Sequence, residues 1–242
     1  MIDTVHPFRR AQHAPTKKVS GAARAVDAYA TLRLRLLEGD YAAGRKLSVV
    51  ELAREFECSR VPVMEALKRL EAEGFVRIVP QVGCNVVVPV AADVRDFFAV
   101  FGAVEGLVAR FAAERRSAAE LEAFEDCCAE IDAALRAAGG PEDRDPLYRR
   151  LNLRFHTEIH RLAHSPATSD VAASLWDRSD FYIKLAFGSL FFSRRVRRSH
   201  LAIRAAIGSG DAAAAESALR AHLHAVGDDV AARFEKVEEK KR

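Results

Sequence analysis

The chain has 242 residues, of which 50% are hydrophobic, and its formal net charge is +3. This length suffices for one large or two ordinary domains with a sizeable core. No run approaches the ~20 apolar residues of a membrane helix, and the four cysteines form no CxxC pair, so a membrane span and a metal-binding cysteine knuckle are excluded. Because the N-terminal stretch of the sequence has no apolar signal segment, we expect a cytoplasmic protein with reduced thiols.

Residues 1–22 are rich in basic residues and proline and lack periodicity, which predicts a disordered basic tail. A helix is expected from about Ala23 to Glu38, because its apolar residues recur at helical spacing. Residues 1–90 carry 14 Lys and Arg against 10 Asp and Glu, whereas the remainder carries 23 against 24. The positive excess therefore lies in the first 90 residues, as phosphate binding would require.

Residues 47–88 predict a helix, a tight turn, a second helix and a β-hairpin. Ser48 can cap the first helix and Ser59 the second, because a hydroxyl accepts an amide hydrogen bond at a helix start. Gly74 ends the second helix, and two β-rich runs flank the turn residues 80–83. This order is typical of a winged helix-turn-helix, whose second helix enters a DNA major groove. The alternative is a small α/β core with ordinary surface charge.

The stretch also resembles the DNA-binding domain of the GntR family of bacterial transcription regulators, over roughly residues 24–89. Met64 stands where that family usually has an arginine, so the guanine contact of the family does not carry over to it. Val61 replaces the usual threonine, and Val82 stands where the wing often has arginine. The residues that carry the resemblance are Gly39, Gly44, Leu47, Leu52, Ala53, Ser59, Arg60, Pro62, Val63, Glu65, Ala66, Leu67, Leu70, Glu73 and Gly74. The DNA-binding residues expected from it are Arg45, Lys46, Ser59, Arg60, Pro62, Lys68 and Arg69.

After residue 90 the apolar periodicity is helical throughout, which predicts an antiparallel bundle of about six helices. Ser117 and Glu120 have the spacing of a capping box, and Asp211 can cap the last helix. A loop is expected at residues 139–146, which contain two glycines and two prolines. The helices are expected at about 93–116, 117–138, 147–163, 168–187, 192–207 and 211–236.

Six of the eight histidines follow residue 155, and their spacing admits a metal site. His156 and His160 lie four residues apart, so that both project from one helix face and can share an ion. His200 and His222 come from two other helices, and a bundle core can bring such ligands together. The alternative is a set of separate surface or hydrogen-bonded core histidines.

The histidine-rich half resembles the FCD effector domain of the FadR-like branch of the GntR family. The resemblance rests on the Phe155-His156 pair, on His200 at the start of the next-to-last predicted helix, and on His222 in the last. In the family an aspartate and three histidines often hold a metal, which implies Asn152, His156, His200 and His222 as ligands here. Asn152 replaces the aspartate, and Zn²⁺, Ni²⁺ or Mn²⁺ each suit such ligands. On this mapping His160 is not a ligand.

Organic acids are frequent effectors in that family, where a metal and an arginine hold them together. The position of this arginine, four residues before Glu105, is Phe101 here, which implies a more apolar pocket. The expected effector-pocket residues are Phe101, Glu105, Tyr148, Arg154, Arg178, Tyr182 and Arg204.

The predicted fold class is mainly α: an N-terminal winged helix-turn-helix of three helices and a β-hairpin wing, followed by an all-α antiparallel bundle. We expect a basic tail at residues 1–22, a DNA-binding domain at 23–89, and an effector-binding and dimerisation domain at 90–236. The predicted function is a ligand-responsive repressor that binds a palindromic operator in double-stranded DNA as a homodimer. One alternative is a bundle that only dimerises. The other is a metal-dependent enzyme, for which neither HExxH nor a nucleophile–base set is found.

Overall fold

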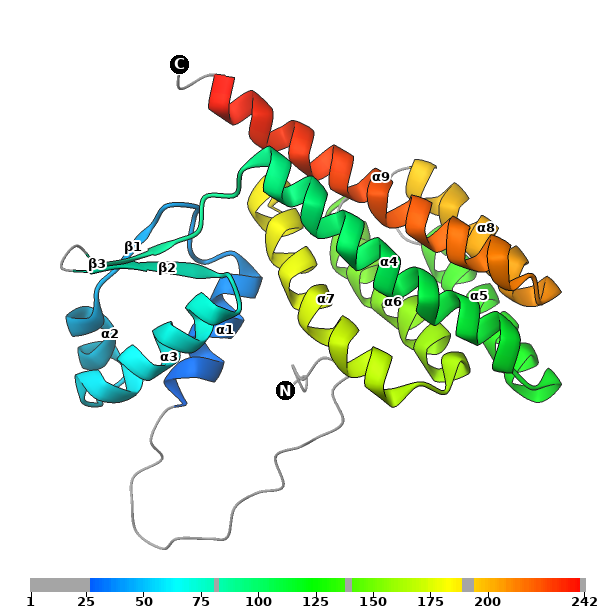
Figure 1. The fold of residues 1–242 in the computed structure, drawn as a ribbon, viewed down its shortest axis with the longest axis horizontal. Coiled ribbons are helices and arrows are strands. Elements are labelled where there is room, and N and C mark those ends of the chain that lie inside the picture. The colour runs from blue at the N-terminus through cyan, green and yellow to red at the C-terminus, as the bar shows by residue number, and fades with distance from the viewer. Residues whose placement is uncertain (1–26, 81–82, 138–140, 189–193, 240–242) are drawn as a thin grey trace, which may run out of the picture.

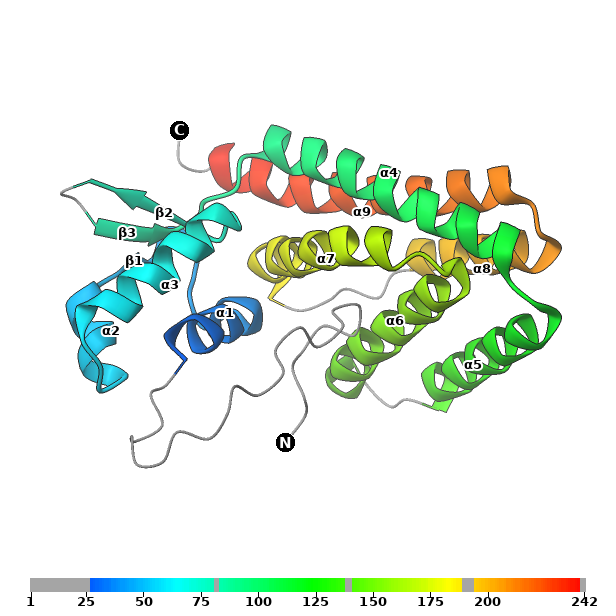
Figure 2. The ribbon, with the colours of Figure 1, turned by 60° about the horizontal axis from the view of Figure 1, so that its bottom comes forward.

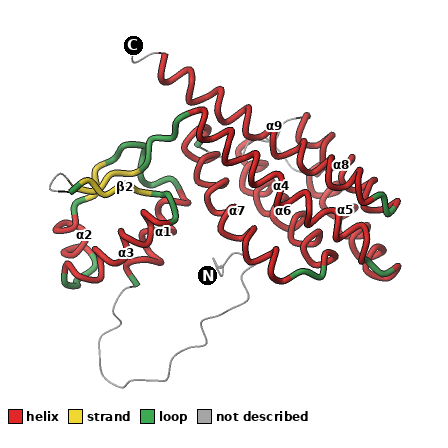
Figure 3. Tube along the Cα trace, viewed as in Figure 1, coloured by secondary structure: helices red, strands yellow, loops and turns green. Residues whose placement is uncertain are grey.

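The computed structural model describes residues 27–80, 83–137, 141–188 and 194–239 (Figure 1). The predicted tail at residues 1–22 and the wing residue Val82 lie outside these ranges. The described chain is mostly helical, with a small three-stranded antiparallel sheet near its N-terminal end (Figure 3). The predicted fold class, a winged helix-turn-helix followed by a helical bundle, is confirmed. None of the described helices is long and apolar enough to cross a membrane.

The N-terminal part holds three helices and the sheet. The sheet has the strand order β1-β3-β2, and both pairings are antiparallel. The hairpin of β2 and β3 was predicted, whereas β1 was not; it pairs Lys46 and Leu47 with Asn85 and Cys84. The elements are α1 (Ala28–Glu38), β1 (Lys46–Leu47), α2 (Val49–Glu55), α3 (Arg60–Ala72), β2 (Val76–Val79) and β3 (Gly83–Val86).

Local capping explains where two of these helices begin. Asp27 accepts a hydrogen bond from the Ala30 amide at 3.1 Å, and Ser48 accepts one from the Glu51 amide at 3.3 Å. Ser59 is the N-cap residue of α3, as predicted, but its side chain does not make the predicted capping hydrogen bond. Pro62 occupies the third position of α3 and has no N–H, so one of the two donors that a capping hydroxyl uses is missing.

Six further helices form the bundle. The capping box at the start of α5 is confirmed, because Ser117 and Glu120 hydrogen-bond each other reciprocally at 2.9 and 3.3 Å. The predicted loop at residues 139–146 is wrong from Pro141 onward, because Pro141 stands at the first helical position, where its missing N–H is harmless. The helices are α4 (Ala91–Arg115), α5 (Ala118–Ala137), α6 (Pro141–Ala163), α7 (Pro166–Phe187), α8 (Arg194–Ser209) and α9 (Ala212–Glu239).

Helices α4 and α9 lie side by side along one face of the bundle, and α5 and α6 lie on the other side (Figure 2). Two glycines of α4 permit the close approach. A Cβ at Gly102 would lie 3.3 Å from the backbone oxygen of Arg220, and one at Gly106 would lie 3.1 Å from that of Glu216. The α4–α9 pair therefore forms a closely packed wall of the bundle.

Helix α7 joins the bundle to the DNA-binding domain. Its Asp177 forms an ion pair with Arg33 of α1, and both side chains are largely buried. Its Phe181 meets Phe75 edge to face, with ring centroids 5.0 Å apart. Because these contacts combine charge with buried aromatic area, α7 is held on the DNA-binding domain as well as on the bundle.

Candidate nucleic-acid interface and metal centre

The start of α3 presents an exposed face to solvent. Ser59, Arg60 and Lys68 are exposed along it, and Val61 between them is 64% exposed. The opposite face carries Val63, Ala66, Leu67 and Leu70, all buried against the domain core. This division orients the N-terminal end of α3 outward, which is the arrangement in which a recognition helix enters a major groove.

The other predicted DNA-binding residues differ in their surroundings. Arg45 and Lys46 are exposed where β1 joins the sheet, whereas Pro62 is half-buried. Arg69 lies 3.5 Å from the ring centre of Tyr29 and 3.4 Å from a carboxylate oxygen of Glu73, so it also fastens α3 to α1. Within the described residues of the domain, Arg69 is the one of the seven whose charge has a partner.

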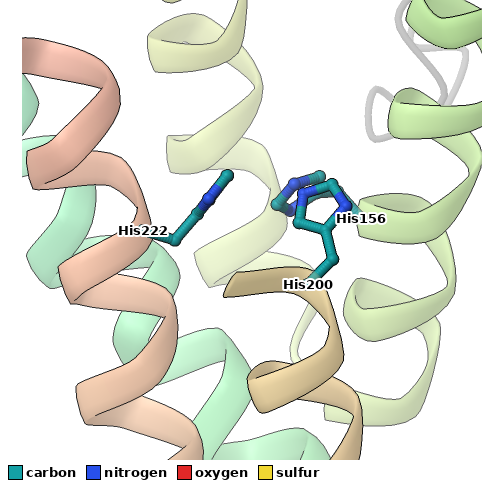
Figure 4. A group of neighbouring side chains, drawn as sticks. All are labelled: His156, His200 and His222. Carbon is teal, nitrogen blue, oxygen red and sulfur yellow. The ribbon is translucent and has the colours of Figure 1, made fainter. Parts of the chain in front are cut away.

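Three histidines from three helices meet in the bundle (Figure 4). His156 of α6, His200 of α8 and His222 of α9 each offer a ring nitrogen, and these nitrogens all lie within 4.8 Å of one another. His156 is fully buried and His222 is 5% exposed. His160 does not join them, because its Nε2 lies 2.8 Å from Glu105 Oε1 and its Nδ1 lies 2.9 Å from Ser169 Oγ. The local pair His156/His160 is therefore not the cluster that forms.

Burial keeps the three clustered imidazoles neutral. It lowers the pKa of His156, lowers that of His200 further, and lowers that of His222 to about 3, with a neighbouring histidine adding to each effect. Burial alone would raise the pKa of Glu105, but His160 and His156 outweigh it and bring the pKa to about 2. A neutral imidazole offers a lone pair to a metal, so the cluster can coordinate without first losing a proton.

Unsatisfied polar atoms gather around the cluster. Glu105 Oε2, both ring nitrogens of His156, and His200 Nε2 are buried and have no hydrogen-bond partner within the described part of the chain. Buried polar groups normally find partners, and leaving one unpaired costs roughly 1–3 kcal/mol. By contrast, Ser199 Oγ lies 2.8 Å from His222 Nδ1 and so orients that ring through its other nitrogen. The residues present therefore fit a divalent metal.

A small cavity of about 40 Å³ adjoins the cluster between α5, α6 and α8. Asn152 and His200 share its wall, and Asn152 precedes His156 by one helical turn, as predicted for a ligand pair. Asn152 Oδ1 accepts a hydrogen bond of 3.2 Å from Tyr148. The remaining walls are Cys128, Ile131, Asp132, Leu135, Tyr148, Leu151, Phe155, Leu201 and Arg204.

Of the seven predicted effector-pocket residues, Tyr148 and Arg204 line this cavity and the other five do not. Arg204 is paired with Glu125 and Asp132, and Arg154 lies on the outer face of α6 with Glu130 at 2.7 Å. Phe101 and Glu105 are buried under Trp176. Arg178 and Tyr182 are hydrogen-bonded to each other at 2.9 Å near the DNA-binding domain.

Comparison with known proteins gives the family. Residues 24–86 match the family described as bacterial regulatory proteins, gntR family, and residues 96–225 match the FCD domain. A regulator from Streptomyces ambofaciens, named as an HTH-type transcriptional regulator in an unstable DNA locus, is 30% identical over 88% of this chain and 87% of its own. The chain belongs to the GntR family. It is therefore a DNA-binding transcription regulator with an FCD domain, and not an enzyme.

Other relatives of this GntR regulator agree in architecture. The HTH-type transcriptional repressor RspR of Escherichia coli is 28% identical over 84% of this chain and 86% of its own. The structure of a GntR regulator from Rhodococcus superimposes with a TM-score of 0.64 at 20% identity, covering 86% of this chain and 98% of that one. E. coli McbR/YncC gives a TM-score of 0.62 at 16% identity, covering 90% of this chain and 100% of that one.

Sequence reasoning missed the side chains that surround the cluster. Trp176 donates from Nε1 to Glu105 Oε1 at 2.9 Å, and its ring lies 4.6 Å from that of His156. Ser199 precedes His200 directly, so its adjacency to a predicted ligand was the only signal available. Ser169 and Trp176 are distant in sequence from every predicted ligand, and no spacing rule could have found them.

Proposed function

We propose that this GntR regulator is a cytoplasmic repressor whose operator affinity responds to a small effector bound beside a metal in the helical domain. The observation that carries the proposal is the position of α7. Trp176 on α7 contacts His156 of the cluster, and the next residue, Asp177, pairs with Arg33 of the DNA-binding domain. A displacement of the His156 ring would therefore be transmitted to α1 through Trp176 and Asp177, which are adjacent residues of α7.

Asn152, His156, His200 and His222 are the proposed ligands, and a bound divalent ion supplies an open coordination position for an effector oxygen. Asn152 and His200 also line the cavity, so an effector there would lie within reach of the ion. We propose a small organic acid as the effector, because its carboxylate oxygens can bind the ion while its hydrocarbon part contacts the apolar walls of the cavity. The cavity of about 40 Å³ is far below the ~300 Å³ of an ordinary ligand site, so effector binding requires helix movement.

That movement is the proposed signal. Because α6 carries both His156 and Asn152, displacing α6 moves the His156 ring against Trp176. The effector shifts operator affinity only if it binds the two arrangements of α7 unequally, and the coupling is then reciprocal. The DNA-binding side would act through Arg60 at the start of α3, with Arg45, Lys46 and Lys68 near phosphates.

A homodimer is proposed through the outer face of α4 and α9. Val100 and Leu107 of α4 are 58% and 42% exposed, and Ala103 lies exposed between them on the same face. The adjoining surface of α9 is a groove in which the small residues Ala213, Ser217, Ala221 and Ala225 alternate with Glu216, Arg220, His224 and Asp228. An exposed apolar stripe beside small residues is suited to packing against a second copy. Two copies related by a two-fold axis match a palindromic operator.

The test is metal content together with thermal melting of the wild type, His200→Ala and His160→Ala. We expect the wild type and His160→Ala to bind about one Zn²⁺ per chain and His200→Ala to lose it. At a Zn²⁺ concentration of 100 times Kd the metal contributes about 2.7 kcal/mol of stability. Retention of metal by His200→Ala would refute the proposed site. A wild type that binds operator DNA but no metal would refute the metal while leaving the DNA-binding function intact.

A further inference from the structure

Glu105 is a buried carboxylate that the proposed metal and DNA sites leave without a function. It lies on α4 and is 0% exposed in the bundle interior. A buried carboxylate is expensive unless it is paired and hydrogen-bonded, so its surroundings should explain its presence. Its two oxygens have different surroundings.

The first oxygen, Oε1, is held by two donors. Trp176 Nε1 donates to it at 2.9 Å, and His160 Nε2 lies 2.8 Å away. An ionised carboxylate only accepts, so the proton on His160 sits on Nε2. His160 is in turn fixed by Ser169 Oγ, 2.9 Å from its Nδ1. His160 of α6 and Trp176 of α7 therefore fix the orientation of the Glu105 carboxylate.

The second oxygen, Oε2, points to the histidine cluster. It lies 3.8 Å from His156 Nδ1, and both atoms are buried without a hydrogen-bond partner among the described residues. At 3.8 Å the contact is too long for a hydrogen bond. A small rotation of the His156 ring would close it, with Nδ1–H as the donor. The opposite ring nitrogen, Nε2, would then carry the lone pair.

We propose that Glu105 is a positioning residue: it accepts the Nδ1–H of His156 and so fixes the tautomer in which Nε2 is free to coordinate the metal. A histidine that ligates a metal almost always donates its other N–H to a carboxylate, a carbonyl or a water. Ser199 has the corresponding position at His222, where its Oγ lies 2.8 Å from Nδ1. Glu105 thereby adds a negative charge next to a centre in which Asn152 contributes none. The inference rests on the metal site proposed above.

The first measurement needs no metal and no variant at Glu105. The tautomer of His156 is read from long-range ¹H–¹⁵N spectra of ¹⁵N-histidine-labelled full-length protein, with the His156 signals assigned by their loss in His156→Gln. We expect the Nδ1–H form in the metal-free wild type. A predominant Nε2–H form would overturn the proposal, whatever the variants do.

The second measurement is Zn²⁺ affinity, by competition with a chromophoric chelator, in Glu105→Gln and Glu120→Gln. Glu120 is the matched control, because it also faces a histidine, His164 at 2.9 Å, but on the surface. We expect Glu105→Gln to bind Zn²⁺ roughly 10–100-fold more weakly, with the His156 tautomer mixed, and Glu120→Gln to match the wild type. Equal affinity in both variants, with a wild type that binds Zn²⁺, would overturn the role of Glu105 alone. A wild type without Zn²⁺ affinity would instead overturn the metal site.

Discussion

The ion pair between Arg33 and Asp177 offers a direct test of whether α7 couples the two domains. We consider Asp177→Asn, which keeps the volume and an acceptor oxygen but removes the charge, and Arg33→Met, which keeps most of the aliphatic stem. The side chains are 7% and 15% exposed. Removing one partner of a fully buried pair costs about 3–5 kcal/mol, and the access of Arg33 to water reduces this to about 2–3 kcal/mol for Asp177→Asn. The double variant should cost less than the sum of the two single variants.

The assay is urea unfolding of the four members of this double-mutant cycle, from which we expect a coupling energy of about 1–3 kcal/mol. The same proteins are then titrated with operator DNA, located by footprinting, with and without Zn²⁺. If α7 carries the signal, the DNA affinity of Asp177→Asn measured with Zn²⁺ should be close to its DNA affinity measured without Zn²⁺. The ion pair of Arg95 and Glu235, at 2.8 Å and exposed, is the control, and Glu235→Gln should change stability by less than about 0.5 kcal/mol.

Two results would refute this reasoning. A coupling energy near zero would mean that the Arg33–Asp177 contact contributes nothing beyond its separate side chains. An unchanged Zn²⁺ response in Asp177→Asn, with normal folding and DNA affinity, would mean that the signal crosses elsewhere between the domains.

Three further predictions concern the other sites. Arg60→Ala should weaken operator binding by about 1–3 kcal/mol at fixed salt, while Met64→Ala should leave the preference at any guanine unchanged; footprint-derived DNA and gel shifts measure both. Leu107→Arg should convert the proposed homodimer to monomer in sedimentation, whereas Val171→Arg, at an exposed apolar position on α7, should not; a dimeric Leu107→Arg would count against the proposed α4–α9 interface. Asn152→Asp should bind Zn²⁺ more tightly than the wild type, because a carboxylate is a stronger ligand, and an unchanged Kd would remove Asn152 from the ligand set.

The fold followed from the sequence wherever periodicity was sustained. The core faces of α2 and α3, and the long apolar pattern of α4, predict elements that the structure contains. Strand β1 was missed because Lys46 and Leu47 are too few to show alternation, and their partner strand lies almost 40 residues further on. The glycines and prolines of residues 139–146 predict a loop that includes Pro141, although proline at a first helical position favours the helix that follows it.

The candidate site was harder to predict, because it depends on how the helices rotate against one another. Helical spacing correctly put His156 and His160 on one face of α6, but it could not show that Glu105 of α4 would engage His160. The rotation of α6 likewise turns Arg154 outward to Glu130, away from the cavity. Residues of one helix can be grouped from sequence alone, whereas the partners they meet are set by tertiary packing.

The departures of α3 from the family pattern and the position of α7 both bear on how the protein distinguishes one DNA sequence from another. Val61, 64% exposed, and Met64 can offer apolar contact to a thymine methyl but no hydrogen bond to a base edge. If Arg60 is the main donor at the start of the helix, as proposed, each DNA-binding domain would read few positions, and phosphate contacts would supply much of its affinity. In the proposed homodimer, selection of an operator would then depend strongly on both domains binding at one fixed spacing. A helix such as α7, which holds the DNA-binding domain at Asp177 and Phe181, can change that spacing with a small movement, and weak readout by each half makes a small movement sufficient.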